Sequence, residues 1–286
     1  MVRIRATGRF GLGALVACLA LVVGGSTADA KTKIIKGKSK TVPANEQATQ
    51  KLPCPSGMQV VGGGAYTDGA TLEDEVAESA PYDSRDDGKK PDDGWRAAIN
   101  AGPSEQQMHA YAVCSDSLKL TYKSRPAGPA SGGGGYGESP CPNGTKAVGG
   151  GMTVKGNNTN APLKNSRPIL DGGAWASMSI FMMSPETEGV AYSICADSDK
   201  IQHVTDGAMQ ASQTQLEVVV SCPEGTRVIG GGGGGGSFDS LELASLNPED
   251  GDDDNSKSDD GWAVWTNNES NDAASAAVSA YAVCLG

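Results

Sequence analysis

Six cysteines of this chain have the spacing of a repeated disulfide framework. The chain has seven cysteines in 286 residues, and six of them form three pairs, separated within the pairs by 60, 54 and 62 residues. An even set of this kind is typical of disulfides in exported chains. Because one spacing recurs three times, we expect one bridge within each pair: Cys54 to Cys114, Cys141 to Cys195, and Cys222 to Cys284. The sequence alone leaves other connectivities open.

A second group of residues has the ligand types that calcium prefers. Asp252, Asp254 and Ser256 alternate along an acidic stretch, as ligands do in a calcium-binding loop. Lys257 stands where such a loop needs Gly, and no Glu closes it. Runs of charge are more often solvated loops. We therefore treat these three residues as a candidate calcium site and expect no other cofactor.

Aromatic side chains offer a third chemistry, because their faces stack on the apolar faces of ligands such as sugars. Three tryptophans recur in phase with the cysteines, which favours core positions: Trp95, Trp175 and Trp262. Four other aromatic residues have no counterpart in the repeat and are the better ligand candidates: Trp265, Tyr66, Tyr82 and Tyr136.

Several other chemistries are disfavoured. The chain has two histidines, His109 and His203, neither in a repeated motif, and no Ser- or Cys-based triad has visible partners. We therefore expect no enzymatic activity. A hydrolase with two facing carboxylates remains the alternative, because acidic residues are plentiful. The net charge of −11 argues against a nucleic-acid partner.

The elements that position these residues are three copies of one unit. Each copy begins with Cys-Pro-x-Gly, continues through a Gly triplet and a Trp, and ends with Tyr-x-x-Cys. Self-similarity at a fixed period indicates a repeat architecture. The units span residues 31–116, 117–198 and 199–286, and the Gly triplets are Gly62–Gly64, Gly149–Gly151 and Gly230–Gly232.

Each unit is predicted to contain short β-strands and no long helix. Gly and Pro recur every eight to twelve residues or so, and helical periodicity is nowhere sustained. A Gly triplet inside a strand indicates a bulge, a bend or a close backbone approach. We expect an all-β, pseudo-threefold, β-prism-like body, with three tandem small β-sandwiches as the alternative. The Gly-rich stretches Pro126 to Gly137 and Gly230 to Ser237 are predicted to be flexible.

The first thirty residues are predicted to be a signal peptide. Three arginines precede an apolar run from Gly11 to Val23, and Ala28-Asp29-Ala30 fits a cleavage site. Cleavage would change the net charge from −11 to −13. No other run is apolar enough for a membrane span. We expect a secreted protein, with a lipid anchor on Cys18 as the alternative.

The chain resembles secreted proteins of unknown function from actinobacteria, streptomycetes especially. The resemblance rests on the repeated Cys-Pro-x-Gly, Gly-Gly-Gly, Gly-Trp and Tyr-Ala-Val-Cys motifs from about Thr32 to Cys284. These motifs carry no known chemistry. The Cys-Pro-x-Gly start is also weakly similar to β-prisms of the vitelline-membrane outer-layer type, a likeness that implies a fold and no activity.

Repetition without catalytic residues suits recognition at several related sites. We therefore expect a non-catalytic binding or surface-associated protein, lectin-like, whose partner is a glycan or a cell-surface polymer. The sites would lie in loops between the motifs. The alternatives are a structural component of a cell or spore envelope and an extracellular polymer hydrolase.

Overall fold

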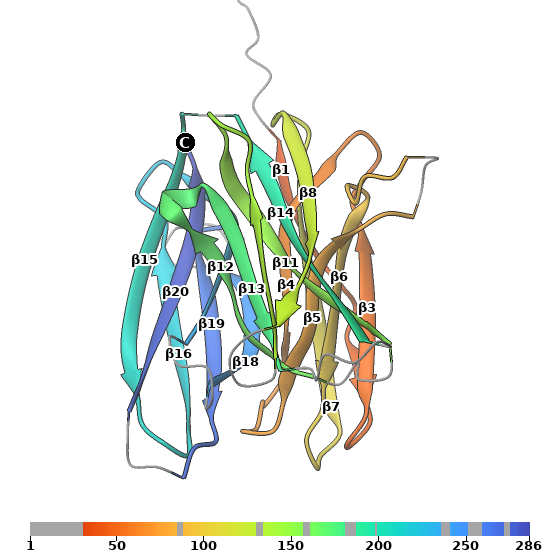
Figure 1. Ribbon diagram of the computed structural model, residues 1–286, viewed down its shortest axis with the longest axis vertical. Coiled ribbons are helices and arrows are strands. Elements are labelled where there is room, and N and C mark those ends of the chain that lie inside the picture. The colour runs from red at the N-terminus through yellow and green to blue at the C-terminus, as the bar shows by residue number, and fades with distance from the viewer. Residues whose placement is uncertain are drawn as a thin grey trace, which may run out of the picture.

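The protein is built almost entirely of antiparallel β-strands. A computed structural model describes residues 31–84, 88–129, 134–156, 161–180, 187–197, 199–235, 241–250, 259–271 and 275–286. These residues contain no α-helix and one short 3₁₀ helix, η1 (Leu170–Gly172). The predicted signal peptide and the candidate calcium loop lie outside them. The strands run roughly along the long axis of the molecule (Figure 1).

The strands form three sheets. Sheet A has the order β1 (Thr32–Lys36), β7 (Gln106–Ser115), β4 (Gln59–Thr67), β18 (Leu241–Glu249), β19 (Gly261–Asn268) and β16 (Thr214–Ser221), with β2 (Lys40–Val42) also paired to β7. Sheet B has the order β3 (Gln47–Pro53), β6 (Gly94–Asn100), β5 (Glu75–Tyr82), β11 (Lys146–Gly156), β14 (Thr187–Ala196) and β8 (Leu120–Pro126). Sheet C has the order β15 (Ile201–Gln210), β20 (Ala276–Leu285), β17 (Arg227–Gly235), β12 (Leu163–Ile169), β13 (Ala174–Ser179), β10 (Gly135–Pro140) and β9 (Gly128–Pro129).

Every sheet combines strands from two repeat units. Sheet A joins β1, β4 and β7 of the first unit to β16, β18 and β19 of the third. Sheets B and C repeat this arrangement with the first and second units and with the second and third units. The junctions match in register: Ala65 pairs with Leu246, Met152 with Ser79, and Gly233 with Ser166. The predicted pseudo-threefold body is confirmed, and tandem sandwiches are not formed.

The Gly triplets make both a bulge and a close approach. The strand register shifts at each triplet, between Val60 and Gly62, Ala147 and Gly149, and Val228 and Gly230. A Cβ on the first Gly of each triplet would lie 2.9, 2.1 or 2.3 Å from a carbonyl oxygen of another unit's bulge, at Ile229, Val61 and Val148 respectively. The three units therefore meet, backbone against backbone, around the pseudo-threefold axis.

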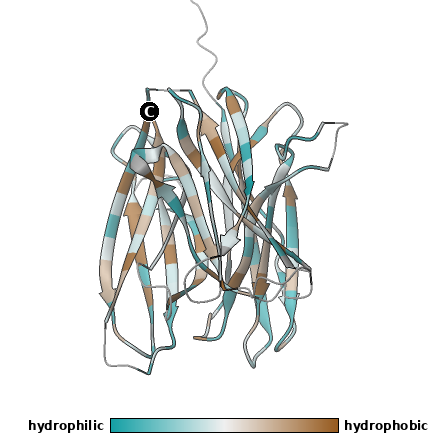
Figure 2. Cartoon of the chain, viewed as in Figure 1, coloured by the Kyte–Doolittle hydropathy of each residue, from teal (hydrophilic) through white to brown (hydrophobic). Residues whose placement is uncertain are grey.

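The second Gly of each triplet makes room for the repeated tryptophan of its own unit. Cβ atoms at Gly63, Gly150 and Gly231 would lie within 2.4 Å of the indole rings of Trp95, Trp175 and Trp262. These tryptophans are at most 1% exposed and belong to one hydrophobic core that includes residues of all three units. The core position predicted for them is confirmed. Figure 2 shows hydrophobic and hydrophilic residues alternating along many strands, as expected for sheets with one buried face.

One disulfide joins each pair of sheets. The structure has the bridges expected from the repeat, Cys54–Cys114, Cys141–Cys195 and Cys222–Cys284, with Cα–Cα distances of 5.8, 5.7 and 5.7 Å. The first cysteine of each pair directly follows β3, β10 or β16, and the second lies in β7, β14 or β20 of another sheet. Each bridge therefore ties one sheet to the next within a unit. Three disulfides also indicate folding in an oxidising compartment.

The prediction of a flexible stretch from Gly230 to Ser237 is wrong for its described part. Gly230–Gly235 lies within β17 and is buried. The run is glycine because neighbours leave no space for side chains, since a Cβ at Gly232 would lie 2.0 Å from the Ser166 carbonyl oxygen. Low complexity at this point reflects packing. In the other stretch, Gly128–Pro129 and Gly135–Pro140 also form strands.

Candidate functional site

Sheet A carries a groove on the face turned away from the core. It has a volume of about 530 Å³. Its lining includes two of the four aromatic residues predicted to bind ligand, Tyr66 and Trp265, together with Tyr111. The polar residues Gln215, Ser245, Asn247, Glu249 and Asp250 complete much of the wall and floor. We call this the sheet A groove.

The order of the strands places aromatic rings on both sides of a polar floor. Tyr111 and Tyr66 lie on β7 and β4, Asn247 on the next strand, β18, and Trp265 on the strand after that, β19. These strands belong to the first and third units, so the groove exists only because the two units share a sheet.

The tyrosine side of the groove is held by a stacked cluster. The rings of Tyr66 and Tyr111 are 5.9 Å apart between centroids, and the His109 ring stacks on Tyr66 with centroids 4.9 Å apart. Lys36 donates a hydrogen bond of 2.9 Å to the Tyr66 hydroxyl and lies 5.3 Å from its ring centroid. This hydrogen bond raises the pKa of Lys36. The tyrosine rings are therefore fixed before a ligand arrives.

The floor and the tryptophan side are also held by hydrogen bonds. On β18, the Ser245 hydroxyl donates to Asn247 Oδ1 at 2.6 Å, and the Asn247 amide donates to Glu249 Oε1. Trp265 Nε1 donates to Glu217 Oε1 at 2.9 Å. Burial raises the pKa of Glu249. The floor thus offers carboxylate and amide groups between two aromatic walls.

The other two predicted aromatic residues lie on different faces. Tyr136 is on β10 of sheet C, where its hydroxyl donates to Glu138 Oε2 at 3.2 Å. Tyr82 is at the end of β5 in sheet B, with Lys51 Nζ 5.4 Å from its ring centroid. The four candidates therefore do not form one site.

Tyr111 and Lys36 were missed by the sequence analysis. Tyr111 belongs to a repeated motif and so resembled a structural residue, and Lys36 lies in a lysine-rich stretch with no distinguishing pattern. We expected the binding sites in loops between the motifs, whereas most residues that line this groove lie on strands. Strands hold side chains more rigidly than loops do.

The histidines do not form a common site. His109 Nε2 lies 3.0 Å from Asp68 Oδ2. His203 Nε2 lies 2.7 Å from the Ala147 carbonyl oxygen, and burial lowers the pKa of His203, so the neutral ring donates this hydrogen bond.

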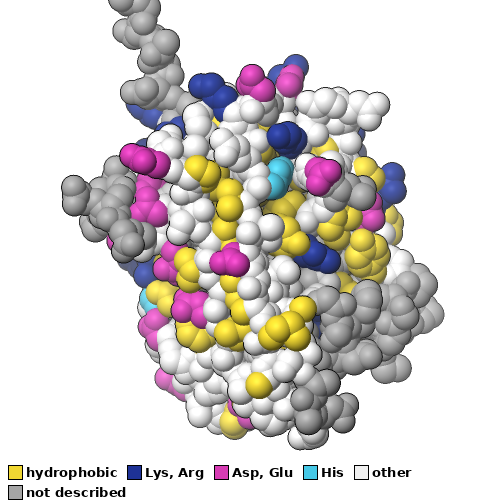
Figure 3. All heavy atoms as spheres, turned by 90° about the vertical axis from the view of Figure 1, so that its left-hand side faces the viewer, with side chains coloured by type: hydrophobic (Ala, Val, Ile, Leu, Met, Phe, Trp, Pro, Cys, Tyr) yellow, Lys and Arg dark blue, Asp and Glu magenta, His cyan; other side chains and the backbone are white. Residues whose placement is uncertain are grey.

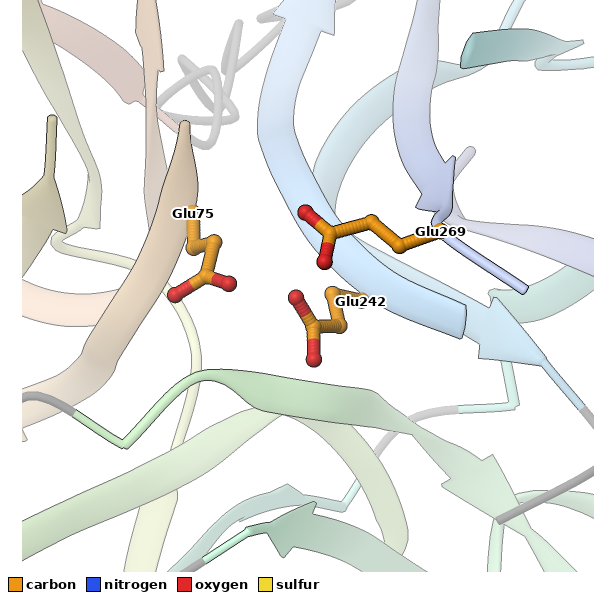
Figure 4. Close-up of side chains that lie close together, drawn as sticks. All are labelled: Glu75, Glu242 and Glu269. Atoms are coloured by element: carbon orange, nitrogen blue, oxygen red, sulfur yellow. The ribbon is translucent and has the colours of Figure 1, made fainter. Parts of the chain in front are cut away.

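Three glutamates from two units form a separate acidic cluster. The carboxylate oxygens of Glu75, Glu242 and Glu269 lie within 4.8 Å of one another (Figure 4). Their oxygens could hold a cation, but a lysine already neutralises part of the charge, because buried Lys164 Nζ is 2.7 Å from Glu242 Oε1. None of these three glutamates lines the sheet A groove.

The three carboxyl groups of the cluster titrate differently. Burial, followed by the hydrogen bond and charge of Glu242, raises the pKa of Glu75 to about 9. Burial opposes ionisation of Glu242 as well, but its hydrogen bond with Glu75 and the charge of Lys164 lower its pKa overall. Burial and the charge of Glu242 raise the pKa of Glu269. At neutral pH, Glu75 therefore keeps its proton and donates a hydrogen bond to ionised Glu242.

This arrangement predicts that Glu75→Gln stabilises the protein at high pH. The pKa of Glu75 rises from 4.5 in the unfolded chain to about 9 in the folded one, so the free energy of unfolding falls as pH rises between these values. Gln is neutral throughout and still donates a hydrogen bond. We expect the variant to match the parent at pH 4 and to exceed it by about 2 kcal/mol at pH 8, measured by urea denaturation.

Two further variants test this cause. Glu242→Gln should destabilise the protein, because it leaves the buried Lys164 ammonium without its partner. Glu224→Gln, at an exposed position outside the cluster, should change stability by less than about 0.5 kcal/mol. An unchanged pH dependence in Glu75→Gln would show that Glu75 is not protonated in the folded protein.

The candidate calcium residues Asp252, Asp254 and Ser256 lie outside the described residues. In the first unit, Asp92 accepts a hydrogen bond from Gln59 Nε2 at 2.6 Å, and Asp93 accepts one from the Ser84 backbone N–H at 2.6 Å. Within the described part of the chain, no helix is long and apolar enough to cross a membrane.

Comparisons with known proteins do not identify a family. No family model matches the chain, and no curated protein matches it. Among solved structures, a match covers 90% of this chain and 90% of the other at 11% identity, with a TM-score of 0.19. That structure is described as the triple jelly roll fold and turret assembly in an archaeal virus. At this TM-score the likeness carries no argument about fold or function.

Proposed function

We propose that the protein is a secreted, non-catalytic saccharide-binding protein and that the sheet A groove is its binding site. The observation that carries the proposal is the placement of half-buried Tyr66 and Trp265, with buried Tyr111 stacked on Tyr66, around a floor of amide and carboxylate groups. Aromatic rings offer flat surfaces to the C–H faces of a sugar, and the polar groups accept hydrogen bonds from its hydroxyls.

The charge and form of the groove favour a neutral saccharide. Glu249 and Asp250 line it, and Glu217 is bonded to Trp265, so acidic ligands would be repelled from the tryptophan side. A groove that is open along a sheet face accommodates a segment of a polymer as well as a short oligosaccharide. A glycan or cell-surface polymer is therefore the expected partner, and the disulfides support an extracellular setting.

Trp265→Ala is expected to weaken saccharide binding by about tenfold or more, because it removes one aromatic wall. An array of neutral glycans identifies the ligand, and calorimetric titration measures its affinity. Titrations with and without Ca²⁺ test whether the candidate calcium residues Asp252, Asp254 and Ser256 contribute to binding. Trp265 is half-buried, whereas the repeated tryptophans are at most 1% exposed, so a ligand-induced change in fluorescence should disappear in this variant.

Tyr82→Ala is the matched control, since it removes a half-buried aromatic side chain from sheet B. It should leave affinity unchanged. If no saccharide binds the mature protein, or if Trp265→Ala binds as tightly as the parent, the proposal is wrong. Recovery of the protein in the cell-surface fraction without any saccharide affinity would instead support a structural envelope component.

A further inference from the structure

Sheet C has a groove that partly corresponds to the sheet A groove by the repeat. It is lined from β12 and β20, the counterparts of β18 and β7, and extends onto β15. Its volume is about 370 Å³, and its lining includes Arg167, Pro168, His203 and Tyr281. Tyr281 corresponds to Tyr111, because each is the first residue of a Tyr-Ala-Val-Cys motif. Pro168 corresponds to Pro248, since each lies two residues beyond a junction residue, Ser166 or Leu246. We call this the sheet C groove.

The two grooves differ at three positions that decide their chemistry. Met178 takes the place of Trp265, so the sheet C groove has no tryptophan wall. Gly234 in sheet C takes the place of Tyr66, and Arg167 takes the place of Asn247. Because β17 is made of glycine from Gly230 to Gly235, no side chain stands between β12 and β20 on this face. The side chain of Arg167 therefore reaches across the glycine strand to Tyr281.

Tyr281 holds the Arg167 guanidinium in position. Arg167 Nη1 donates to the Tyr281 hydroxyl at 2.9 Å, and the guanidinium carbon lies 5.8 Å from the ring centroid. None of the ion pairs found among the described residues includes Arg167. A guanidinium is always charged, and its planar donors match a carboxylate. An oriented cation without a carboxylate partner is thus available at this groove.

The remaining groups around Arg167 fit a sugar more than a simple anion. Asp171, an exposed residue, lines the groove and can accept hydrogen bonds from hydroxyls, while Thr205 occupies the place of Lys36. His203 is neutral, since burial lowers its pKa. Figure 3 views the side of β15 and β20 and shows hydrophobic, basic and acidic side chains close together there, with no continuous basic patch.

We propose that the sheet C groove is a second saccharide site, selective for an acidic sugar whose carboxylate pairs with Arg167. This inference rests on the proposed saccharide-binding function and extends it to a second face. The chain would then hold a neutral sugar on sheet A and an acidic one on sheet C, as two sites that have diverged from one repeated position.

The test compares trigalacturonate with its neutral methyl ester, two probes that share one sugar and differ in charge. Calorimetric titration uses the mature full chain. The parent should bind the acid at least about fivefold more tightly than the ester, and added salt should reduce the difference. Arg167→Gln should abolish this preference, and Arg167→Lys should retain only part of it, because Lys lacks the planar fork. Urea midpoints verify that both variants are folded.

Trp265→Ala separates this inference from the proposed function. It should leave the preference for the acid intact while weakening the neutral saccharide found on the array. If Trp265→Ala changes nothing and Arg167→Gln abolishes acid binding, the sheet A proposal fails and the sheet C site stands. If the acid and the ester bind equally, or if Arg167→Gln binds the acid like the parent, the sheet C site is overturned.

Discussion

Gly151→Ala is expected to destabilise the protein by more than about 3 kcal/mol or to prevent its folding. A Cβ at this position would lie 1.7 Å from the Ser79 carbonyl oxygen and 2.7 Å from its carbon. Both belong to the backbone of β5, which is paired on its other side with β6, so they cannot move aside without breaking sheet B. Urea denaturation, or the yield of folded secreted protein, measures the effect.

The equivalent positions and one exposed glycine provide controls. Gly64→Ala and Gly232→Ala should be similarly damaging, because their Cβ atoms would each lie 2.0 Å from a carbonyl oxygen, of Leu246 and Ser166. Gly128→Ala should be tolerated within about 0.5 kcal/mol, since nothing lies within 4 Å of its Cβ. A stable Gly151→Ala protein would mean that β11 and β5 are not paired as the structure has them.

The fold could be predicted from the sequence at the level of repeats and strands, because these depend on local pattern. The Cys-Pro-x-Gly and Tyr-x-x-Cys motifs mark the same strand ends in each unit. The partners of the Gly triplets could not be predicted, since they depend on long-range pairing. Gly149 meets Val61 of the first unit, and Gly230 meets Val148 of the second. No periodicity within a unit indicates which other unit its glycines approach.

The candidate site was only partly predictable for the same reason. Tyr66 and Trp265 were selected because each breaks the repeat, but only the order of sheet A shows that they line one groove. Tyr82 and Tyr136 satisfied the same criterion and lie on other sheets. Arg167 has no sequence signal of its own, because its significance comes from the glycine strand beside it.

Divergence among the repeats has also left one unsatisfied group in the core. Trp95 and Trp175 donate indole hydrogen bonds of 3.0 and 2.9 Å to the hydroxyls of Ser79 and Ser166. In the third unit, Leu246 stands at the position of these serines. Trp262 Nε1 is therefore buried without a hydrogen-bond partner among the described residues. The packing around the axis is therefore kept more strictly than the hydrogen bond that accompanies it.

Replacing Cys141 and Cys195 together by Ala is expected to lower the free energy of unfolding by about 4 kcal/mol. The bridge closes a loop of 54 residues and joins the end of β10 in sheet C to β14 in sheet B. Without it, the unfolded chain gains conformational freedom and sheets B and C lose their covalent link within this unit. Urea denaturation of the oxidised protein gives the loss, and intact mass verifies that two bridges remain.

The other two bridges make this prediction specific to loop closure. Their sequence separations are 60 and 62 residues, and loop entropy depends on the logarithm of loop length. The three paired Cys→Ala variants should therefore lose nearly the same stability, within about 1 kcal/mol of one another. A loss of stability confined to one pair would show that local packing around that bridge, rather than the repeated cross-link, stabilises the fold. Equal losses of stability would mean that each pair of sheets depends on its bridge to the same extent, as the pseudo-threefold arrangement requires.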